Sequence, residues 1–320
     1  MSAGSLPQQL PSGGLPGPGT PAPVSAPPST PAPPSAPAPA PAPPYAPPRS
    51  VTDLGACFFY HSMDLPGFGE VTGEWDLRPG VADYLGRVDF AGKRVLELGT
   101  ADGFLTFEIE KAGGEVVSYD LDSARSLDLV PFARRRGSPV GSSGVDFAEL
   151  IPRMNDAYWL AHAALESSAR IVYGDVYSVP DAIGPVDVAV FGTILLHTRD
   201  PFAALARSLP MVRETVVVTE DHGRFLLPEV LGRLRQRLPR ALRRPGMRFI
   251  PDWRTSTEPE GWWRLSPELL QAFLGVLGFE ASVVIRHAQL YRGAPRQMFT
   301  VVAHRTVAGE PGERTGREHG

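Results

Sequence analysis

The sequence predicts an α/β fold, a doubly wound and mostly parallel sheet that ends in an antiparallel strand pair. Short, continuous apolar runs alternate with segments in which apolar residues recur at helical spacing. Continuous apolar strands are buried on both faces, which is typical of parallel sheets covered by helices. The last two apolar runs follow one another with no helix between them, and this indicates an antiparallel pair.

The elements can be justified in chain order. Strands are expected at 93–99, 114–120, 170–173, 186–191 and 214–219, with helices between them at 104–112, 147–167 and 201–209. The third helix opens with Pro201 directly after Asp200, which is a sound N-terminal cap. After Thr219 the pattern lapses for about 45 residues. It resumes with a helix at 267–277 and strands at 281–286 and 298–304.

Proline and charge divide the chain into tails and one domain. Of the 35 prolines, 18 fall in the first 50 residues, and no charged side chain precedes Arg49. Such a segment buries too little surface to offset its ordering entropy, so residues 1–50 are expected to be disordered. They serve either as a spacer or as a P-x-x-P ligand of aromatic grooves. Residues 51–306 are expected to form one domain, followed by a disordered end at 307–320.

Several protein classes are excluded by composition. Cys57 is the only cysteine, so neither a disulfide framework nor a cysteine-based zinc site is expected. The seven histidines show no paired spacing, and no metal site is expected. No stretch reaches 18 apolar residues, and the N-terminus lacks a basic start before an apolar run. A cytoplasmic protein without a membrane partner is therefore expected. The net charge of −4 argues weakly against general nucleic-acid binding.

The loop after the first strand carries the strongest functional signal. Gly99 permits a tight turn off the strand, and Gly103 lets the next helix pack closely. The second strand ends at Asp120, where a carboxylate can accept hydrogen bonds from a ribose diol. The spacing is G-x-x-x-G rather than G-x-G-x-x-G, and Asp102 within the loop would repel a pyrophosphate. The loop therefore favours a cationic nucleoside over NAD, and an NAD oxidoreductase is disfavoured.

These segments resemble the class I S-adenosylmethionine-dependent methyltransferases. VLELGTADGF is similar to their first motif, VVSYDLD to the acidic end of their second strand, and VYGDVYSVP to their adenine-contacting segment. The resemblance covers roughly residues 58–305, and it implies a Rossmann-like fold with S-adenosylmethionine as cofactor. FYHSMDLPGFGEVTGEWDLR, LLHTRDP and EPEGWWRLSPELLQAFLGVLGF narrow it to a bacterial branch that includes the wobble-uridine (5-oxyacetyl type) tRNA methyltransferases. Ala101 departs from the pattern at the middle glycine, and the long basic N-terminal part of the tRNA enzymes is missing.

The resemblance also implies a set of cofactor residues. Those expected around the aminoacyl side and the ribose are Glu97, Gly99, Thr100, Gly103, Asp120 and Leu121. Asp175 and Val176 would meet the adenine, and Phe191 and Gly192 would floor the methionyl part. The alternative for the glycines is ordinary turn chemistry, and for Asp175 it is a surface turn.

Three histidines are candidate general bases, because methylation of a hydroxyl benefits from proton removal near neutral pH. His197 follows the fourth strand, His222 follows the fifth, and His61 lies in a segment before the first. Each has an alternative structural role. Trp75 and Arg78 are expected to line a lid over the site, although Trp75 is also a candidate core residue.

The irregular region after the fifth strand is rich in arginine. Between Arg224 and Arg254, nine arginines face only Glu229 and Asp252. Such a cluster suits an anionic substrate or RNA, and the alternative is a solvated amphipathic helix at 226–242. Segments 51–90 and 223–265 are expected to close over the active site.

The function expected is methyl transfer to a small molecule, at a hydroxyl in specialised metabolism. A tRNA wobble-uridine methyltransferase is the first alternative, and a non-catalytic cofactor-binding protein acting through its proline-rich tail is the second. The resemblance leaves a carboxylated analogue of the cofactor open. The acceptor atom (O, N or C) and the oligomeric state stay open as well.

Overall fold

A computed structural model describes residues 45–123, 127–132, 146–221, 244–254 and 259–306. All of them belong to one compact unit that begins at Pro41. Most of the predicted N-terminal tail, the predicted tail at 307–320, His222 and the predicted helix at 226–242 lie outside the described residues.

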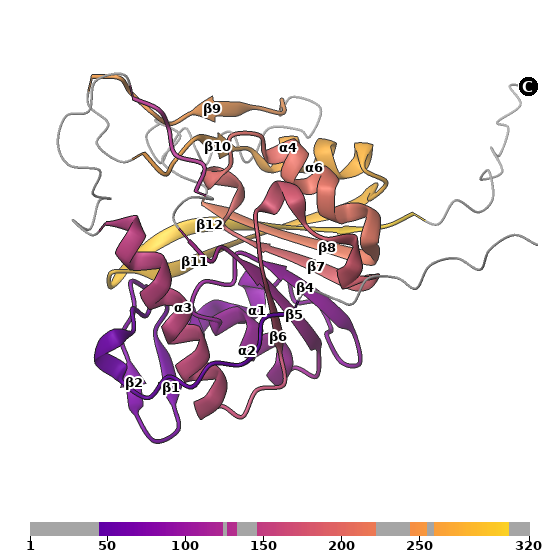
Figure 1. Ribbon diagram of the computed structural model, residues 1–320. Helices are drawn as coiled ribbons and strands as arrows, with labels where there is room; N and C mark the ends of the chain where they lie inside the picture. Colours follow the sequence, from indigo (N-terminus) through magenta and orange to yellow (C-terminus); the bar gives the residue numbers. More distant parts are fainter. Residues whose placement is uncertain (1–44, 124–126, 133–145, 222–243, 255–258, 307–320) are drawn as a thin grey trace, which may run out of the picture. The chain divides into compact units, whose positions relative to one another are not determined.

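The centre of the unit is a mixed, eight-stranded sheet in the order β3-β11-β12-β8-β7-β4-β5-β6 (Figure 1). The five mutually parallel strands are β4 (Arg94–Leu98), β5 (Glu115–Asp120), β6 (Arg170–Tyr173), β7 (Val186–Gly192) and β8 (Val212–Asp221). The antiparallel strands are β3 (Trp75–Asp76), β11 (Ala281–Tyr291) and β12 (Ala294–His304). The fold class predicted from the sequence is confirmed, including the final strand pair.

The order of the strands reverses at β4. The chain runs outward from β4 to β5 and β6, and then returns to place β7 on the other side of β4. The connections that follow β4 and β7 therefore leave the sheet in opposite directions. In open α/β sheets this reversal opens a crevice beyond the carboxyl ends of the strands, where ligands bind.

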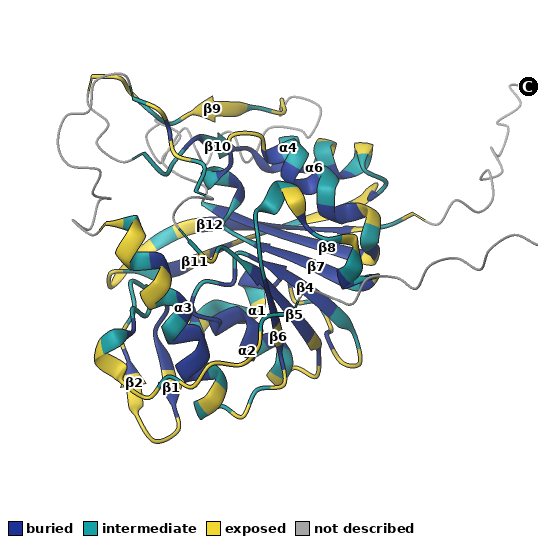
Figure 2. Ribbon diagram, viewed as in Figure 1, coloured by how far each residue is buried: buried dark blue, intermediate teal, exposed yellow. Residues whose placement is uncertain are grey.

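Helices cover both faces of the sheet, and each face has its own apolar core. One core contains residues of α1 (Val81–Tyr84), α2 (Phe104–Lys111) and α3 (Phe147–Ala164). The other contains residues of α4 (Pro201–Ser208) and α6 (Pro267–Val276). Figure 2 shows the central strands and the inner helix faces buried and the outer faces exposed. The predicted cap of α4 is confirmed, because the Asp200 side chain accepts a hydrogen bond from the Ala203 N–H at 2.9 Å.

Short elements complete the unit. The single-turn 3₁₀ helices are η1 (Leu54–Ala56), η2 (Arg78–Gly80), η4 (Val176–Ser178), η5 (Asp181–Ile183), η6 (Leu195–His197) and η7 (Leu209–Met211). Two small antiparallel ribbons pair β1 (Met63–Leu65) with β2 (Gly69–Val71) and β9 (Met247–Phe249) with β10 (Trp263–Leu265). The sequence analysis missed both ribbons and β3, because strands of two or three residues are too short to display a period.

The first described residues lie against the sheet. The Ala46 N–H donates to the Ile171 carbonyl oxygen of β6 at 2.8 Å, and the Arg170 guanidinium lies 4.3 Å from the centre of the Tyr45 ring. No helix among the described residues is both long and apolar enough to cross a bilayer. The described residues also contain no cluster of three His, Cys, Asp or Glu side chains arranged to hold a metal ion.

Candidate active site

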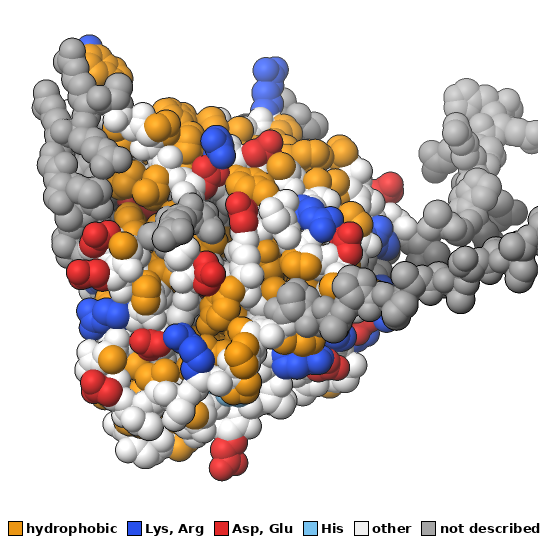
Figure 3. Space-filling model, in the orientation of Figure 1, with side chains coloured by type: hydrophobic (Ala, Val, Ile, Leu, Met, Phe, Trp, Pro, Cys, Tyr) orange, Lys and Arg blue, Asp and Glu red, His pale blue; other side chains and the backbone are white. Residues whose placement is uncertain are grey.

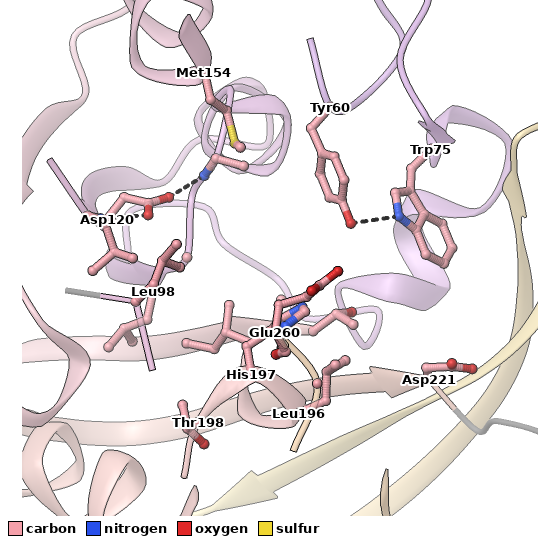
Figure 4. A pocket seen from close by; sticks show the side chains of 18 of the residues that line it. Tyr60, Trp75, Leu98, Asp120, Met154, Leu196, His197, Thr198, Asp221 and Glu260 are labelled. Atoms are coloured by element: carbon pink, nitrogen blue, oxygen red, sulfur yellow. Dashed lines mark hydrogen bonds between the residues drawn. The ribbon is translucent and has the colours of Figure 1, made fainter. Parts of the chain in front are cut away.

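A cavity of about 860 Å³ lies where the strand order reverses. Its wall is formed by the ends of β4, β5, β7 and β8, together with η4, η6, α3 and the β10 and β11 regions. In Figure 4, Asp120 lies on one side of the cavity, Trp75 and Asp221 lie on the other, and His197 lies between them. We call the side around Asp120 and Gly99 the cofactor half, and the side around Trp75, Asp221 and Tyr291 the acceptor half.

The cofactor half is built around the β4–α2 loop and Asp120. One oxygen of the Asp120 carboxylate accepts from the Ala101 N–H at 2.5 Å, and the other accepts from the Leu121 N–H at 2.6 Å. Burial raises the pKa of Asp120 to about 6. Ala101 holds a φ of 52° at the position where the resembling family has glycine, so its left-handed backbone is kept without a glycine. Gly99, Asp120 and Leu121 all line the cavity.

The η4 segment forms the next part of this half. Asp175 and Val176 line the cavity, and an Asp175 carboxylate oxygen accepts from the Tyr177 N–H at 2.8 Å. The Tyr177 hydroxyl in turn donates to Asp128 at 2.7 Å. The Asp128 carbonyl oxygen also accepts from the Trp262 Nε1–H. These bonds link η4 to the segment before β10 across one wall of the cavity.

Four predicted cofactor residues lie behind the cavity wall. Glu97 and Thr100 are 1% exposed and Phe191 is fully buried. Gly103 caps α2 at a φ of 87°, where an added Cβ would come within 2.7 Å of the Phe107 ring. None of the four lines the cavity, in contrast to Gly192. Their assignment to the cofactor site therefore stays a prediction.

Glu97 shows why such a residue lies behind the cavity wall. Side chains alternate along β4, and Glu97 follows Leu96 and precedes Leu98, which pack in the core on the opposite face. Its carboxylate lies beneath the loop, where it accepts hydrogen bonds from the Thr100 and Thr106 hydroxyls. Burial raises the pKa of Glu97 to about 7. The residue therefore supports the loop from below.

His61 and Asp102 form a buried pair that joins the segment before β1 to the β4–α2 loop. The His61 backbone N–H donates to Asp102 Oδ2, and His61 Nδ1 lies 2.6 Å from Asp102 Oδ1. The His61 ring stacks on Phe104 at a centroid distance of 5.7 Å, and His61 lines the cavity. The sequence analysis assigned the Asp102 charge to recognition of a cationic ligand. That assignment is corrected, because both carboxylate oxygens bind His61 and Asp102 is fully buried.

His197 lies at the boundary between the two halves, on η6. Its Nδ1 atom lies 2.7 Å from the Glu260 carbonyl oxygen. Because a carbonyl oxygen only accepts, Nδ1 carries the proton, and Nε2 is the acceptor atom of a neutral ring. Burial lowers the pKa of His197 below its usual value, which keeps the ring neutral near pH 7. The residue lines the cavity, as expected of a candidate base.

Glu220 is a further residue of the site that was not singled out from the sequence. It lies near the end of β8, is 2% exposed, and accepts from the Leu195 N–H at 2.9 Å. Burial raises its pKa to about 8. Because Leu195 opens η6, this carboxyl group anchors the turn that carries His197. Its position after an apolar strand was visible in the sequence, but its partner, 25 residues earlier, was not.

The acceptor half contains aromatic side chains and ion pairs. The Trp75 indole N–H donates to the Tyr60 hydroxyl at 3.1 Å, and the Trp75 and Tyr291 ring centroids are 4.8 Å apart. Asp221 pairs with two arginines, Arg264 at 3.3 Å and Arg296 at 2.5 Å. A second pair joins Arg292 to Glu74 at 2.6 Å.

Two lid expectations have different outcomes. Trp75 lines the cavity. Arg78 is not among the lining residues, since its guanidinium pairs with Asp64, Glu70 and Asp76 and thereby ties the β1–β2 ribbon to β3. Of the arginine-rich stretch only residues 244–254 are described, so Arg244, Arg248 and Arg254 are described, whereas the other six arginines and His222 lie outside the described residues.

No protein-family model and no curated protein matches the chain, whereas solved structures of similar fold do. The magnesium protoporphyrin IX methyltransferase of Synechocystis, with bound S-adenosylhomocysteine, is 12% identical over 72% of this chain and 82% of that chain, at a TM-score of 0.43. The 1,6-didemethyltoxoflavin N1-methyltransferase of Burkholderia thailandensis is 14% identical over 72% and 78%, at 0.44. A SAM-dependent methyltransferase of Methanosarcina mazei is 16% identical over 71% and 97%, at 0.42. None of the three is described as a wobble-uridine enzyme, and that finer resemblance stays a prediction.

Proposed function

We propose that this protein transfers a methyl group from S-adenosylmethionine to a hydroxyl group of a small molecule. The observation that carries the proposal is the arrangement of one cavity at the point of strand reversal. Its cofactor half bears carboxylates, its acceptor half bears aromatic rings and arginines, and His197 lies between them. A volume of about 860 Å³ is within the range that encloses small ligands.

The residues of the cofactor half fit S-adenosylmethionine. Asp120 offers a carboxylate at the end of the second parallel strand, the position that suits a ribose diol. Asp175 and Val176 would face the adenine, and Gly99 and Gly192 would adjoin the methionyl part. The acidic lining suits the positive charges of the ammonium and sulfonium groups. When bound, the cofactor supplies an electrophilic methyl group on a sulfonium centre.

The chain's own contribution to the reaction is positioning and proton removal. His197 Nε2 would accept the proton of the acceptor hydroxyl when the methyl group is transferred, so that the hydroxyl proton ends on the imidazole ring. The Glu260 carbonyl holds the ring in the tautomer that this step needs. Glu220 fixes the turn on which the ring is mounted. The enclosed cavity positions the partners and limits the access of water.

The face shown in Figure 3 bears acidic and basic side chains intermingled among the described residues. A cavity of about 860 Å³ and a face without a continuous basic patch among the described residues support a small acceptor over an RNA. The acceptor atom is proposed to be oxygen because the neutral His197 ring is a suitable base for a hydroxyl.

The proposal is tested by measuring S-adenosylhomocysteine formation from S-adenosylmethionine, with a metabolite extract in one reaction and bulk tRNA in another. We expect turnover with the extract and none with tRNA. Turnover with tRNA alone would favour the wobble-uridine alternative, and a lack of turnover with every acceptor would favour a non-catalytic cofactor-binding protein. Arg213→Gln, on an exposed side chain at the start of β8, is the matched control that should leave turnover unchanged.

A further inference from the structure

The arginines of the cavity wall are confined to the acceptor half. Three guanidinium groups line the cavity, those of Arg264, Arg292 and Arg296. The described residues that line the cofactor half include Asp120, Asp128 and Asp175 but no lysine or arginine. The acceptor half also holds Glu74 and Asp221, so the two halves differ in that guanidinium groups, partly paired with these acids, line only the acceptor half.

The single negative charge of Asp221 does not balance the positive charges of the two arginines that bind it. Its Oδ2 atom accepts from Arg264 Nη1 at 3.3 Å and from Arg296 Nε and Nη2 at 3.2 and 2.5 Å. One carboxylate thus carries one negative charge against two positive charges. Each guanidinium has five N–H donors, so this pair has donors to spare for a second carboxylate.

One of these donors is buried without a partner. The Nε atom of Arg264 is buried and has no hydrogen-bond acceptor among the described residues. A buried donor left without an acceptor costs about 1–3 kcal/mol, so such groups are uncommon in folded proteins. Arg264 lines the cavity and its side chain is 21% exposed, so a bound anion can approach this side chain.

Aromatic side chains stand beside this arginine pair. Trp75 and Tyr291 lie at a centroid distance of 4.8 Å, and the Arg296 guanidinium lies 6.0 Å from the centre of the Tyr291 ring. Aromatic walls of this kind accept flat rings in offset or edge-to-face contact. Two other acids lie near this half: Glu74 pairs with Arg292, and Glu260 lies beside His197 in Figure 4, away from Asp221. Asp221 and the two arginines that bind it therefore lie apart from His197 (Figure 4).

Resting on the proposed function, we infer that the acceptor is a planar, hydroxylated carboxylic acid. Its carboxylate binds Arg264 and Arg296, its ring lies against Trp75 and Tyr291, and its hydroxyl faces His197.

The test compares an acid with its neutral isostere, 4-hydroxybenzoate and 4-hydroxybenzamide, by calorimetric titration of protein saturated with S-adenosylhomocysteine. The wild type should bind the acid about tenfold tighter, because charge-assisted hydrogen bonds distinguish the two. In Arg296→Gln the preference should fall to about twofold or less, whereas the control Arg213→Gln should keep it. Equal binding of acid and amide, binding of neither, or a preference that survives Arg296→Gln would overturn the inference.

Two further arms separate the possible failures. Saturation with S-adenosylhomocysteine is measured first, so a protein that does not bind it refutes the proposed function itself. In the second arm, S-adenosylmethionine and its carboxylated analogue are titrated without an acceptor. Similar affinities in the wild type support the inference. A tenfold preference for the carboxylated analogue that Arg296→Gln abolishes would assign the carboxylate to the cofactor, and the acceptor inference would be wrong.

Discussion

The two halves of the cavity are assembled in different ways. The cofactor half comes from short segments that each follow a parallel strand, at 99–101, 120–121 and 174–177. The acceptor half brings together residues that are far apart in the chain; the Tyr291 hydroxyl, for example, donates to Glu74 across 217 positions. The first half therefore leaves a local signature in the sequence, and the second does not. They also differ in charge, because acids line both halves and arginines line only the acceptor half.

The largest expected effect falls on the boundary between the halves. His197→Asn should lower kcat by about a thousandfold, because the acceptor proton loses its base. The affinity for S-adenosylhomocysteine should stay within about twofold of the wild type, since the ring does not hold the cofactor. Steady-state kinetics and calorimetry measure the two quantities. As a control, His162→Asn alters a histidine of α3 whose ring is bonded to the Ala169 carbonyl. An unchanged kcat in His197→Asn would remove this residue from the mechanism.

Asp120→Ala should have the next largest effect and should confine it to the cofactor half. The loss of charge-assisted hydrogen bonds to the ribose should weaken binding of S-adenosylhomocysteine by about a hundredfold. Calorimetry measures this loss. Asp122→Ala, which removes an exposed carboxylate two residues away, should leave the affinity unchanged. Equal affinities in wild type and Asp120→Ala would show that the cofactor half has been misassigned.

Asp102→Ala should act on stability, since this carboxylate joins the segment before β1 to the β4–α2 loop. Its removal leaves two buried nitrogen atoms of His61 without their acceptor, and the free energy of unfolding should fall by about 2 kcal/mol. Urea denaturation measures the change. Asp89→Ala is the control. It removes an exposed carboxylate that accepts a hydrogen bond from the Ala91 N–H, and it should lower the free energy of unfolding by less than about 0.5 kcal/mol. If the free energy of unfolding falls no more in Asp102→Ala than in Asp89→Ala, the His61–Asp102 pair does not stabilise the fold.

The pH dependence of cofactor binding should report on Asp120. Burial raises its pKa to about 6, so the carboxylate becomes protonated and loses acceptor capacity below that pH. The affinity for S-adenosylhomocysteine should be constant above pH 7 and about tenfold weaker at pH 5. Calorimetry across this range gives the curve. Asp120→Asn should lack this dependence, and a variant with the same curve as the wild type would assign the titration to another group.

Glu220, which anchors the turn beneath His197, should affect the free energy of unfolding in a pH-dependent way. Burial raises its folded-state pKa from 4.5 to about 8, so the folded protein binds more protons than the unfolded chain between these values. Its contribution to stability is therefore lost as pH rises. The free energy of unfolding of wild type relative to Glu220→Gln should fall steadily from pH 5 to pH 8, by up to about 1.4 kcal/mol for each pH unit. A difference that does not vary with pH, in denaturation series on both proteins, would contradict the assignment.

The contrast between the halves also explains what the sequence could predict. The strands β4 to β8, the β4–α2 loop and Asp120 were all predicted, because each is specified by neighbouring residues. The orientation of Glu97 and the pairing of Asp102 with His61 were not, since they depend on which face of β4 is covered and on a partner 41 positions away. The arginine pair on Asp221 was missed for the same reason, because Arg296 lies 75 positions beyond it.

The central claim, that this cavity binds the adenosyl cofactor of a methyltransferase, is tested most directly by competition. The protein is incubated with equimolar S-adenosylhomocysteine and NAD, freed of unbound ligand by gel filtration and denatured, and the released ligand is identified by mass spectrometry. The wild type should release about one equivalent of S-adenosylhomocysteine per protein chain, and Asp120→Ala should release little. Retention of NAD, or of neither ligand, would contradict it.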